Sequence, residues 1–553
     1  MERKDFGVLY GQKTTEDALL IYSSYEDSKA SPITGDFIVL TPRDEDETKF
    51  LARVEAEIYD EDPIFRSQDK TLVAVHFARI AERELSERDK QKIFSYTYNV
   101  RILGTFTSDG KDFTTAVRKL PTVGYHARYL TSREVQNILN RENENGAPIG
   151  HLCIGEDIQE KKGEILFDVD KLRNSRTMIF AQSGFGKTNL VKVLLSHLIR
   201  NESYGKLIFD LNGEYFLRGT NTYGLGDIDE QKIKNNLIVF TDKKFDDKYK
   251  GRFTGAGNAM LNLVNDLSIN DILQTAAGLT STGRTFLEFV DTTPNSKDFL
   301  DKVFNESDPK EIRHMAYRAF SSYFETKKTE TENPEVKQHL QAMLGAVIRQ
   351  IKSFISIHDK SSQLVESVLK QLKQGKTVII DLSLKDSVDA SIISTILVRK
   401  LFEHNKLYFT SDKREEVINT VIFVEEAQNV LSEEFVKSNA NPFVRVAKEG
   451  RKFGLGLAAI TQRPSAISEE IRTQAENFFA FHMGNSDDIK ALIKSNINYD
   501  GVIAKFIQRE TIKGNLYMVS SDQAFVLPVR VLEFEKLAER NVYEDSKFKK
   551  TVN

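Results

Sequence analysis

The sequence predicts an α/β fold in which helices flank a parallel sheet, preceded by a smaller β-rich domain. The main observation is a series of short, continuous apolar runs after about residue 151, most of which lead into polar or acidic residues. Runs without alternation are typical of strands buried on both faces of a parallel sheet, and periodic helical stretches lie between several of them. The predicted strands are "RTMIF" (176–180), "LIFD" (207–210), "TVIID" (377–381), "NTVIFVEE" (419–426), "LGLAAITQ" (455–462), "FFAFH" (478–482) and "NLYMVS" (515–520).

The segment before about residue 150 has a different pattern, in which apolar and polar residues alternate. In residues 50–59, "FLARVEAEIY", the apolar residues face one way and charged residues such as Arg53 face the other. Residues 96–102, "YTYNVRI", repeat this pattern, with Thr97 and Asn99 on the polar face. Several half-buried strands in one segment predict a small barrel or a sandwich.

Turn and loop signals mark the end of this first domain. A shorter candidate strand, "GDFIVL", follows a turn at Gly35-Asp36, and the acidic run 43–48 is typical of a solvated loop. The polar stretch 141–150, which contains glycine and proline, is a typical boundary.

A long segment within the α/β region has no strand-like run. Apolar residues recur at helical spacing in 339–355 and 363–373, and a charged loop with proline is expected at 326–336. This pattern indicates a helical insertion. The expected segments are an N-terminal domain (1–150), a first core part (151–255), a helical insertion (256–374), a second core part (375–535) and a tail (536–553).

Composition restricts the class of protein. Of the 553 residues, 40% are hydrophobic and 29% are charged, and the formal net charge is −4. A polyanion would therefore have to be held by a local patch. The single cysteine, Cys153, excludes an internal disulfide framework and fits a reducing cytosol. Because the first residues carry no secretory signal and no apolar run approaches the roughly 18 residues of a membrane span, we expect a cytoplasmic protein with no membrane partner.

The strongest functional signal is "AQSGFGKTN" (181–189). It fits the phosphate-loop pattern G-x-x-x-x-G-K-[ST] when alanine is allowed first, and it lies between a predicted strand and a predicted helix. Gly184 and Gly186 would let successive N–H groups converge on phosphates, and the helix would add its positive end. Lys187 would contact the β- and γ-phosphates, while Thr188 would offer a hydroxyl to Mg²⁺. The alternative is an ordinary glycine-rich turn. The residues expected to bind the nucleotide are Ser183, Gly184, Phe185, Gly186, Lys187, Thr188 and Asn189.

A second segment, "VIFVEEAQN" (421–429), supplies the carboxylates that nucleotide hydrolysis needs. Four apolar residues form a predicted strand, and Glu425 and Glu426 emerge at its carboxyl end. Glu425 would lie beside Mg²⁺, through a water, and Glu426 would orient and deprotonate the attacking water. The alternative is a strand that ends in solvated acids.

Other polar residues also end predicted strands. Gln462 would sense the γ-phosphate and Arg463 would neutralise developing charge, although a plain turn fits these two residues nearly as well. Asp210 and Asp381 end two further strands. The carboxyl ends of parallel strands form the edge where ligands bind in such folds.

Five segments carry a family resemblance: "AQSGFGKTN", "LIFDLNGEYF", "VIFVEEAQNVL", "KEGRKFGLGLAAITQRPS" and "FFAFHMGNSDDI". In this order and spacing the chain resembles the HerA branch of the HerA–FtsK P-loop ATPases, over nearly its whole length. The resemblance implies a RecA-like core with a small N-terminal β-barrel. It also implies a homo-hexameric ring that binds ATP and Mg²⁺ between subunits and moves double-stranded DNA through its pore. A partner nuclease or sirtuin-like NADase is implied as well, in DNA end processing or anti-phage defence.

The resemblance also assigns residues. Lys187 and Thr188 match the phosphate loop, Glu426 the catalytic carboxylate and Gln462 the sensor glutamine. Arg451 is the first candidate for the arginine supplied in trans to the neighbour's ATP. Arg445 is the second candidate.

Two positions depart from the family pattern. Glu425 replaces the usual aspartate, and Gln428 stands where the family often has histidine. Both departures concern the coupling of hydrolysis to motion more than nucleotide binding.

Two other functions are compatible with the sequence. In the first alternative, the ring would be a scaffold that assembles and activates an effector, with ATP as an assembly ligand. In the second alternative, the chain would be a secretion or conjugation ATPase of the same superfamily. The second alternative ranks lower because such proteins often carry or contact membrane segments. A kinase or GTPase is disfavoured, since the chain lacks an N-K-x-D guanine signature and its paired glutamates suit water attack.

Overall fold

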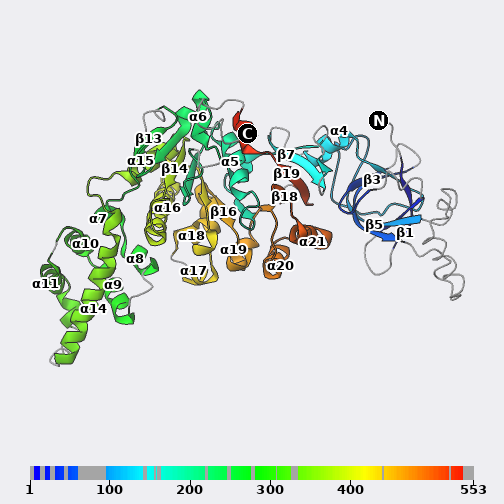
Figure 1. Cartoon of the computed structure of the whole chain (residues 1–553). Helices are drawn as coiled ribbons and strands as arrows, with labels where there is room; N and C mark the ends of the chain where they lie inside the picture. Colours follow the sequence, from blue (N-terminus) through cyan, green and yellow to red (C-terminus); the bar gives the residue numbers. More distant parts are fainter. Residues whose placement is uncertain are drawn as a thin grey trace, which may run out of the picture. The chain divides into compact units, whose positions relative to one another are not determined.

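The structure is a computed structural model of the chain (Figure 1). It describes residues 5–539, apart from 13–18, 25–31, 43–47, 60–94, 141–145, 155–156, 159–162, 218–221, 246–250, 276–279, 307, 326–333, 439–440, 522 and 524. The described residues form two compact units. One comprises 1–168, 180–186 and 477–532, and the other comprises 169–179, 187–476 and 533–553. The segment boundaries expected from the sequence remain predictions.

Six strands of the first unit close into a barrel, drawn mostly in blue in Figure 1. The sequence left a barrel and a sandwich open, and the structure decides for the barrel. Apolar side chains from all six strands and from the flanking residues fill its interior, with Ile21, Leu40 and Val54 wholly buried. In barrel order the strands are β1 (Gly7–Gln12), β2 (Leu19–Ser24), β5 (Ser95–Phe106), β4 (Lys49–Tyr59), β3 (Phe37–Thr41) and β6 (His126–Tyr129).

The alternation predicted for β4 and β5 is only partly correct. Arg53, expected on a polar face, is 2% exposed, and Thr97 and Asn99 are buried as well. The register between β4 and β5 shifts twice, which breaks a strict two-residue period. Arg53 is accommodated because its guanidinium contacts the carboxylate of Glu55 at 2.7 Å. The predicted acidic loop at 43–48 lies almost entirely outside the described residues.

The rest of the first unit is an antiparallel array, which corrects the prediction of a parallel strand at 515–520. The β17–β18, β18–β19 and β19–β7 pairs are all antiparallel. The short connection 520–526 allows only this direction, because parallel strands need a long crossover. The strands are β17 (Asn477–Ala480), β18 (Asn515–Val519), β19 (Leu527–Val531), β7 (Ala147–Ile154), β8 (Asp157–Ile158) and β9 (Glu164–Phe167), and the helices are α4 (Ser132–Glu134), η2 (Val135–Leu139), α20 (Ser486–Ser495), η12 (Ile497–Tyr499) and α21 (Val502–Arg509).

The second unit contains the parallel sheet that the apolar runs predicted. The β12–β13, β12–β14, β11–β14, β11–β15 and β15–β16 pairs are parallel, and the strands expected at 207–210, 377–381, 419–426 and 455–462 all belong to them. In sheet order the strands are β13 (Thr254–Gly257), β12 (Leu237–Phe240), β14 (Thr377–Asp381), β11 (Gly205–Asp210), β15 (Thr420–Val424), β16 (Leu455–Thr461) and β10 (Arg176–Phe180).

The register of this sheet brings several polar residues to one edge. Asp210 lies opposite Asp381, and Phe209 lies opposite Val424, the residue before Glu425. Val424 in turn lies opposite Ala459 in β16. The carboxyl ends of three neighbouring strands, β14, β11 and β15, therefore carry acidic side chains at the same edge, where open α/β sheets bind ligands.

Helices cover this sheet, and α15 and α18 pack directly on its strands. Helix α16 lies beside α18 and begins where the Asp386 side chain accepts hydrogen bonds from the backbone N–H groups of Val388 and Asp389. Apart from the helices between β13 and α15, the helices are η4 (Val169–Leu172), α5 (Lys187–Leu198), η5 (Leu225–Asp227), α6 (Gln231–Asn236), α15 (Leu364–Lys373), α16 (Ser387–Phe409), η8 (Arg414–Glu416), η9 (Ala427–Asn429), α17 (Glu433–Ser438), α18 (Pro442–Glu449), η10 (Gly450–Phe453), η11 (Pro464–Ala466), α19 (Glu469–Arg472) and α22 (Phe534–Glu539).

Between β13 and β14 the described residues are mainly helical, drawn in green in Figure 1. The helical spacing seen at 339–355 lies in α14 and the short helix after it, and the spacing at 363–373 lies in α15. Most of the loop predicted at 326–336 lies outside the described residues, although α14 already begins at Pro334. The helices are α7 (Leu263–Asp266), α8 (Ile269–Thr275), α9 (Ser281–Asp291), α10 (Ser296–Asn305), α11 (Pro309–Ala319), α12 (Ser321–Glu325), α14 (Pro334–Lys352) and η7 (Ser353–Ile357).

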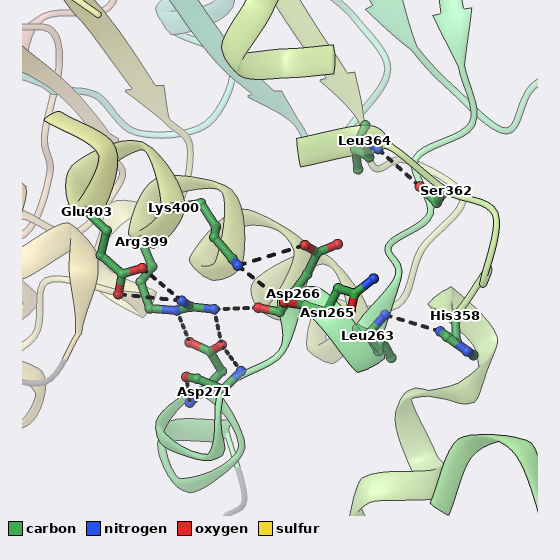
Figure 2. A network of polar contacts seen from close by, with 11 residues as sticks. Leu263, Asn265, Asp266, Asp271, His358, Ser362, Leu364, Arg399, Lys400 and Glu403 are labelled. Carbon is green, nitrogen blue, oxygen red and sulfur yellow. Dashed lines mark hydrogen bonds and ion pairs between the residues drawn. The ribbon is translucent and has the colours of Figure 1, made fainter. Parts of the chain in front are cut away.

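A polar network ties the first of these helices to α16 (Figure 2). The Arg399 guanidinium donates to both oxygens of the Asp271 carboxylate, at 3.0 and 2.8 Å, and to the backbone carbonyl of Asp266. Lys400 donates to the carbonyl of Asn265 at 3.3 Å. Asp271 is completely buried, so its charge depends on this arginine. The network therefore fixes α7 and α8 against α16.

The two ends of this helical segment are also joined to each other. The backbone N–H of Leu261 donates to the carbonyl oxygen of Ile357, and the N–H of Asp359 donates to the carbonyl oxygen of Leu261, both at 2.9 Å. The N–H of Leu263 donates to Nδ1 of His358 at 3.2 Å (Figure 2). The segment thus leaves and re-enters the sheet region through a hydrogen-bonded neck. Within the part of the chain that the structure describes, no helix has the length and apolar character required to cross a bilayer.

Candidate nucleotide site

The predicted phosphate loop connects β10 to α5, with a backbone that requires glycine at two points. Gly184 and Gly186 have φ values of 82° and 111°, in the region that side-chain-bearing residues rarely adopt. A Cβ at Gly186 would also lie 3.4 Å from the ring of Phe481. The loop is held by the N–H of Phe185, which donates to the carbonyl of Gln182, and by the ring of Phe185, 4.4 Å from that of His482. Ser183 and Gly184 are exposed.

Lys187 opens helix α5 and lies near both glutamates. Burial lowers the pKa of Lys187, whereas the negative charges of Glu426 and Glu425 raise it. The lysine is half-buried, so it lies in the field of the two carboxylates without being sealed from solvent. Thr188 follows as the second, half-buried residue of the helix.

Asn189 has a structural partner in this structure. Its side-chain oxygen accepts a hydrogen bond of 2.8 Å from the N–H of Phe534, the first residue of α22. Asn189 therefore holds the start of α22 (Phe534–Glu539) against α5. Its expected contact with nucleotide stays a prediction, and so do those of Ser183 and Phe185.

Glu425 is held by a loop that follows β11. The Tyr215 hydroxyl donates to Oε1 of Glu425 at 2.6 Å, and the Asn212 amide donates to Oε2 at 3.4 Å. Asp210 shapes that loop, because its buried carboxylate accepts hydrogen bonds from four successive backbone N–H groups, those of residues 212–215. The sequence cluster "LNGEYF" thus folds around an aspartate and presents a tyrosine to the glutamate.

The environment of Glu425 changes its acidity. The pKa of Glu425 is raised from 4.5 to about 7, first by burial and also by the charges of Asp210, Glu214 and Glu426, while the hydrogen bond from Tyr215 lowers it. Without a bound metal ion, neutral pH therefore lies within the range in which this carboxyl group gains or loses its proton. A divalent cation would favour its ionised form.

Glu426 stands on a turn with a left-handed backbone, at φ 48° and ψ 44°. Both carboxylate oxygens accept hydrogen bonds from amides. Gln462 donates to Oε1 at 3.0 Å and Gln428 donates to Oε2 at 2.7 Å. The structure therefore brings the predicted sensor glutamine into contact with the predicted catalytic carboxylate.

The two candidate arginines differ in their surroundings. The Arg451 side chain is 74% exposed, and its nearest ionic partner is Glu476, at 3.8 Å. The guanidinium of Arg445 lies 4.4 Å from the centre of the Phe402 ring, on which it stacks. Arg451 is thus the one available to another molecule. Arg463 is also exposed, whereas Asp381 is occupied by Thr241 and Lys243.

The donor atoms at this edge fit Mg²⁺. Mg²⁺ prefers oxygen ligands, and with nucleotides it usually takes only one or two from the protein. The Glu425 carboxylate, whose protonated form burial favours, and the Thr188 hydroxyl are oxygens of this kind. The residues described contain no group of three or more histidine, cysteine or acidic side chains placed to hold a metal alone.

Sequence reasoning missed Tyr215 and Asn212. The signal was present, because a polar cluster directly follows the strand that ends in Asp210. The sequence does not reveal that this loop lies close to Glu425, since that closeness depends on how Asp210 folds the loop.

Comparisons with known proteins show which proteins the chain resembles. Residues 151–401 match the family model described as the central domain of the helicase HerA. The chain is 26% identical, over 72% of its length and 72% of the relative's, to the DNA double-strand break repair helicase HerA of Sulfurisphaera tokodaii. It is 21% identical, over 86% of its length, to the probable helicase MJ1565 of Methanocaldococcus jannaschii, of which 82% is covered.

Solved structures give more distant matches. VirB4 of Thermoanaerobacter pseudethanolicus is 15% identical, with 70% of this chain and 96% of that chain covered, but its TM-score of 0.41 is too low to support an inference. The sequence relatives and the central-domain match select the same family that the motifs indicated. Over most of its length the chain is therefore similar to HerA-type ATPases.

Proposed function

We propose that the chain is an ATP-driven motor that moves double-stranded DNA as a ring of six identical subunits. The observation that carries the proposal is the group formed by Lys187, Glu425, Glu426 and Gln462 at one edge of the sheet. A lysine for phosphate, a carboxylate for water and an amide joined to that carboxylate are the parts that phosphoryl transfer to water needs. The relatives named as helicases support the choice of DNA as the moved molecule.

Each residue has a distinct task in this proposal. Lys187 and the N–H groups of the loop hold the β- and γ-phosphates of ATP, and Glu426 orients the attacking water and accepts its proton. Gln462 links that carboxylate to the γ-phosphate. Mg²⁺, when bound by Thr188 and Glu425, neutralises phosphate charge.

The proposal extends to architecture and partners. Residues 256–374 would be a helical insertion in a RecA-like core that spans 151–255 and 375–535. DNA would be held through its phosphates, with little sequence preference and a strong dependence on salt. A partner nuclease or NADase would supply the effector activity, in the cytoplasm, for DNA end processing or anti-phage defence.

The direct test combines a mass measurement with ATPase assays of the purified protein. We expect a six-subunit particle whose ATPase activity rises when linear duplex DNA is added, and falls back as salt is raised. A monomer whose ATPase activity ignores DNA would remove the motor. A ring that activates an effector with bound ATP alone would favour the scaffold instead.

A mixture of two inactive variants tests the trans arginine. Lys187→Ala and Arg451→Ala are each expected to lose ATPase activity, and rings co-expressed from both at equal amounts are expected to recover about a quarter of it. Recovery follows because a subunit with Lys187 then sometimes faces a neighbour with Arg451. The readout is the ATPase rate of the purified mixed rings.

Arg445→Ala is the matched control, because its guanidinium stacks on Phe402 within the subunit. This variant should hydrolyse ATP at close to the normal rate. Normal activity of Arg451→Ala alone, or no recovery in mixed rings, would exclude Arg451 as the shared residue.

A further inference from the structure

A second amide, besides that of Gln462, holds the Glu426 carboxylate. Gln428 donates to Oε2 of Glu426 at 2.7 Å, and Thr461 lies 2.6 Å from the other end of the Gln428 amide. Thr461 is the last residue of β16 and is 1% exposed, so its position is fixed by the sheet. A buried strand end is thus connected to the carboxylate through one side chain.

Hydrogen-bond chemistry fixes the direction of this connection. The Thr461 oxygen accepts a hydrogen bond of 2.9 Å from the N–H of Arg463. Its single proton is then available for the carbonyl oxygen of Gln428. The Gln428 amide is thereby oriented with its NH₂ group toward Glu426, and it must donate to the carboxylate.

The backbone at Glu426 explains why such support is needed. The left-handed region is unfavourable for a residue with a side chain, so this conformation of Glu426 persists only where its surroundings determine it. Gln462 cannot be a constant support, since its proposed role takes it to the γ-phosphate. Gln428 has no such second task.

We propose that Gln428 and Thr461 are positioning residues, which hold the Glu426 carboxylate in the orientation that activates water. Thr461 acts through Gln428, and Gln428 keeps Glu426 in place when Gln462 turns to the phosphate. An ionised carboxylate can accept about four hydrogen bonds, so two amide donors leave room for the attacking water. This inference rests on the proposed ATP hydrolysis.

The test compares Thr461→Val, which keeps the shape but loses the hydroxyl, with Thr461→Ser, which keeps the hydroxyl. We expect Thr461→Val to lower kcat about tenfold or more, because a carboxylate misplaced by an ångström loses much of its effect. KM and the dissociation constant of the fluorescent analogue mant-ATP should stay within about twofold of the wild type. Thr461→Ser should restore kcat.

Gln428→Leu is a second variant with the same expected loss, and Asn429→Ala, on the exposed neighbouring residue, is the control expected to behave normally. A wild-type kcat in Thr461→Val and Gln428→Leu would overturn the inference. A parallel loss of mant-ATP binding would also overturn it, because that would indicate general damage. Absence of ATPase activity in the wild type would overturn the proposed function itself.

Discussion

We expect replacement of Glu426 by glutamine to lower kcat for ATP hydrolysis by about 10²- to 10⁴-fold, while mant-ATP still binds. Glutamine has nearly the same shape as glutamate, but it cannot accept the proton of the attacking water. Nucleotide binding depends on the loop and Lys187, which the substitution leaves in place. The measurement is the steady-state ATPase rate together with a mant-ATP titration, with and without linear duplex DNA.

Glu434→Gln is the matched control, since it removes the same charge from an exposed position in the nearby helix α17. This variant should show the wild-type rate. If Glu426→Gln kept a rate within a few-fold of the wild type, Glu426 would not be the general base.

The Glu426→Gln variant also distinguishes a motor from a scaffold. A motor needs repeated hydrolysis, so Glu426→Gln rings should bind DNA and ATP but fail to move along the duplex. A scaffold that requires only bound ATP should still activate its effector. Translocation and effector activity measured on one preparation therefore distinguish the two functions.

Much of the sheet was predictable because burial on both faces leaves a clear trace in sequence. Continuous runs such as 377–381 and 455–462 are strands of the parallel sheet in the structure. The run at 515–520 is a buried strand too, but an apolar run carries no information on strand direction. Its antiparallel pairing follows from the short connection to β19.

The barrel shows the opposite limit, where the local pattern predicts which way a residue faces but not whether it is exposed. Phe50, Ala52 and Val54 of β4 fill the barrel as the alternation predicts. Arg53, on the other face, is nevertheless 2% exposed and contacts Glu55. A period read along a single strand cannot reveal what covers its outer face.

The sequence predicted the main residues of the candidate site, but not the residues that hold them in place. Lys187, Glu425, Glu426 and Gln462 follow from motifs, because each ends or begins an element at the ligand edge. Tyr215 reaches Glu425 only because Asp210 gathers four N–H groups of the loop between them. The choice between Arg451 and Arg445 also needed the structure, since exposure and stacking on Phe402 have no sequence signature.

Glu425→Gln should stabilise the nucleotide-free protein at alkaline pH while it impairs hydrolysis. The pKa of Glu425 is raised from 4.5 to about 7, first by burial and then by the neighbouring acids. Because the folded state holds this proton more tightly than the unfolded state, stability falls as pH rises from about 4.5 to about 7, and the loss is complete above that range. A shift of this size costs at most about 3 kcal/mol.

The expected measurement is a set of thermal unfolding midpoints at pH 5 and pH 8, without nucleotide and with Mg²⁺-ATP. Without nucleotide, Glu425→Gln should unfold at a higher temperature than the wild type at pH 8. At pH 5 the two midpoints should lie closer together, because the difference in the free energy of unfolding should then be less than about 1 kcal/mol. Mg²⁺-ATP should raise the midpoint of the wild type more than that of the variant.

Glu415→Gln, in the exposed helix η8, controls for the loss of one negative charge and should show no comparable change with pH. Equal unfolding midpoints for Glu425→Gln and the wild type at pH 8 would contradict the inference that the ionised Glu425 carboxylate destabilises the folded protein. The physical reason for keeping such a group is that a site prepared for a cation must hold its negative charges before the cation arrives. We expect the stability that the nucleotide-free protein lacks to be regained when Mg²⁺-ATP binds.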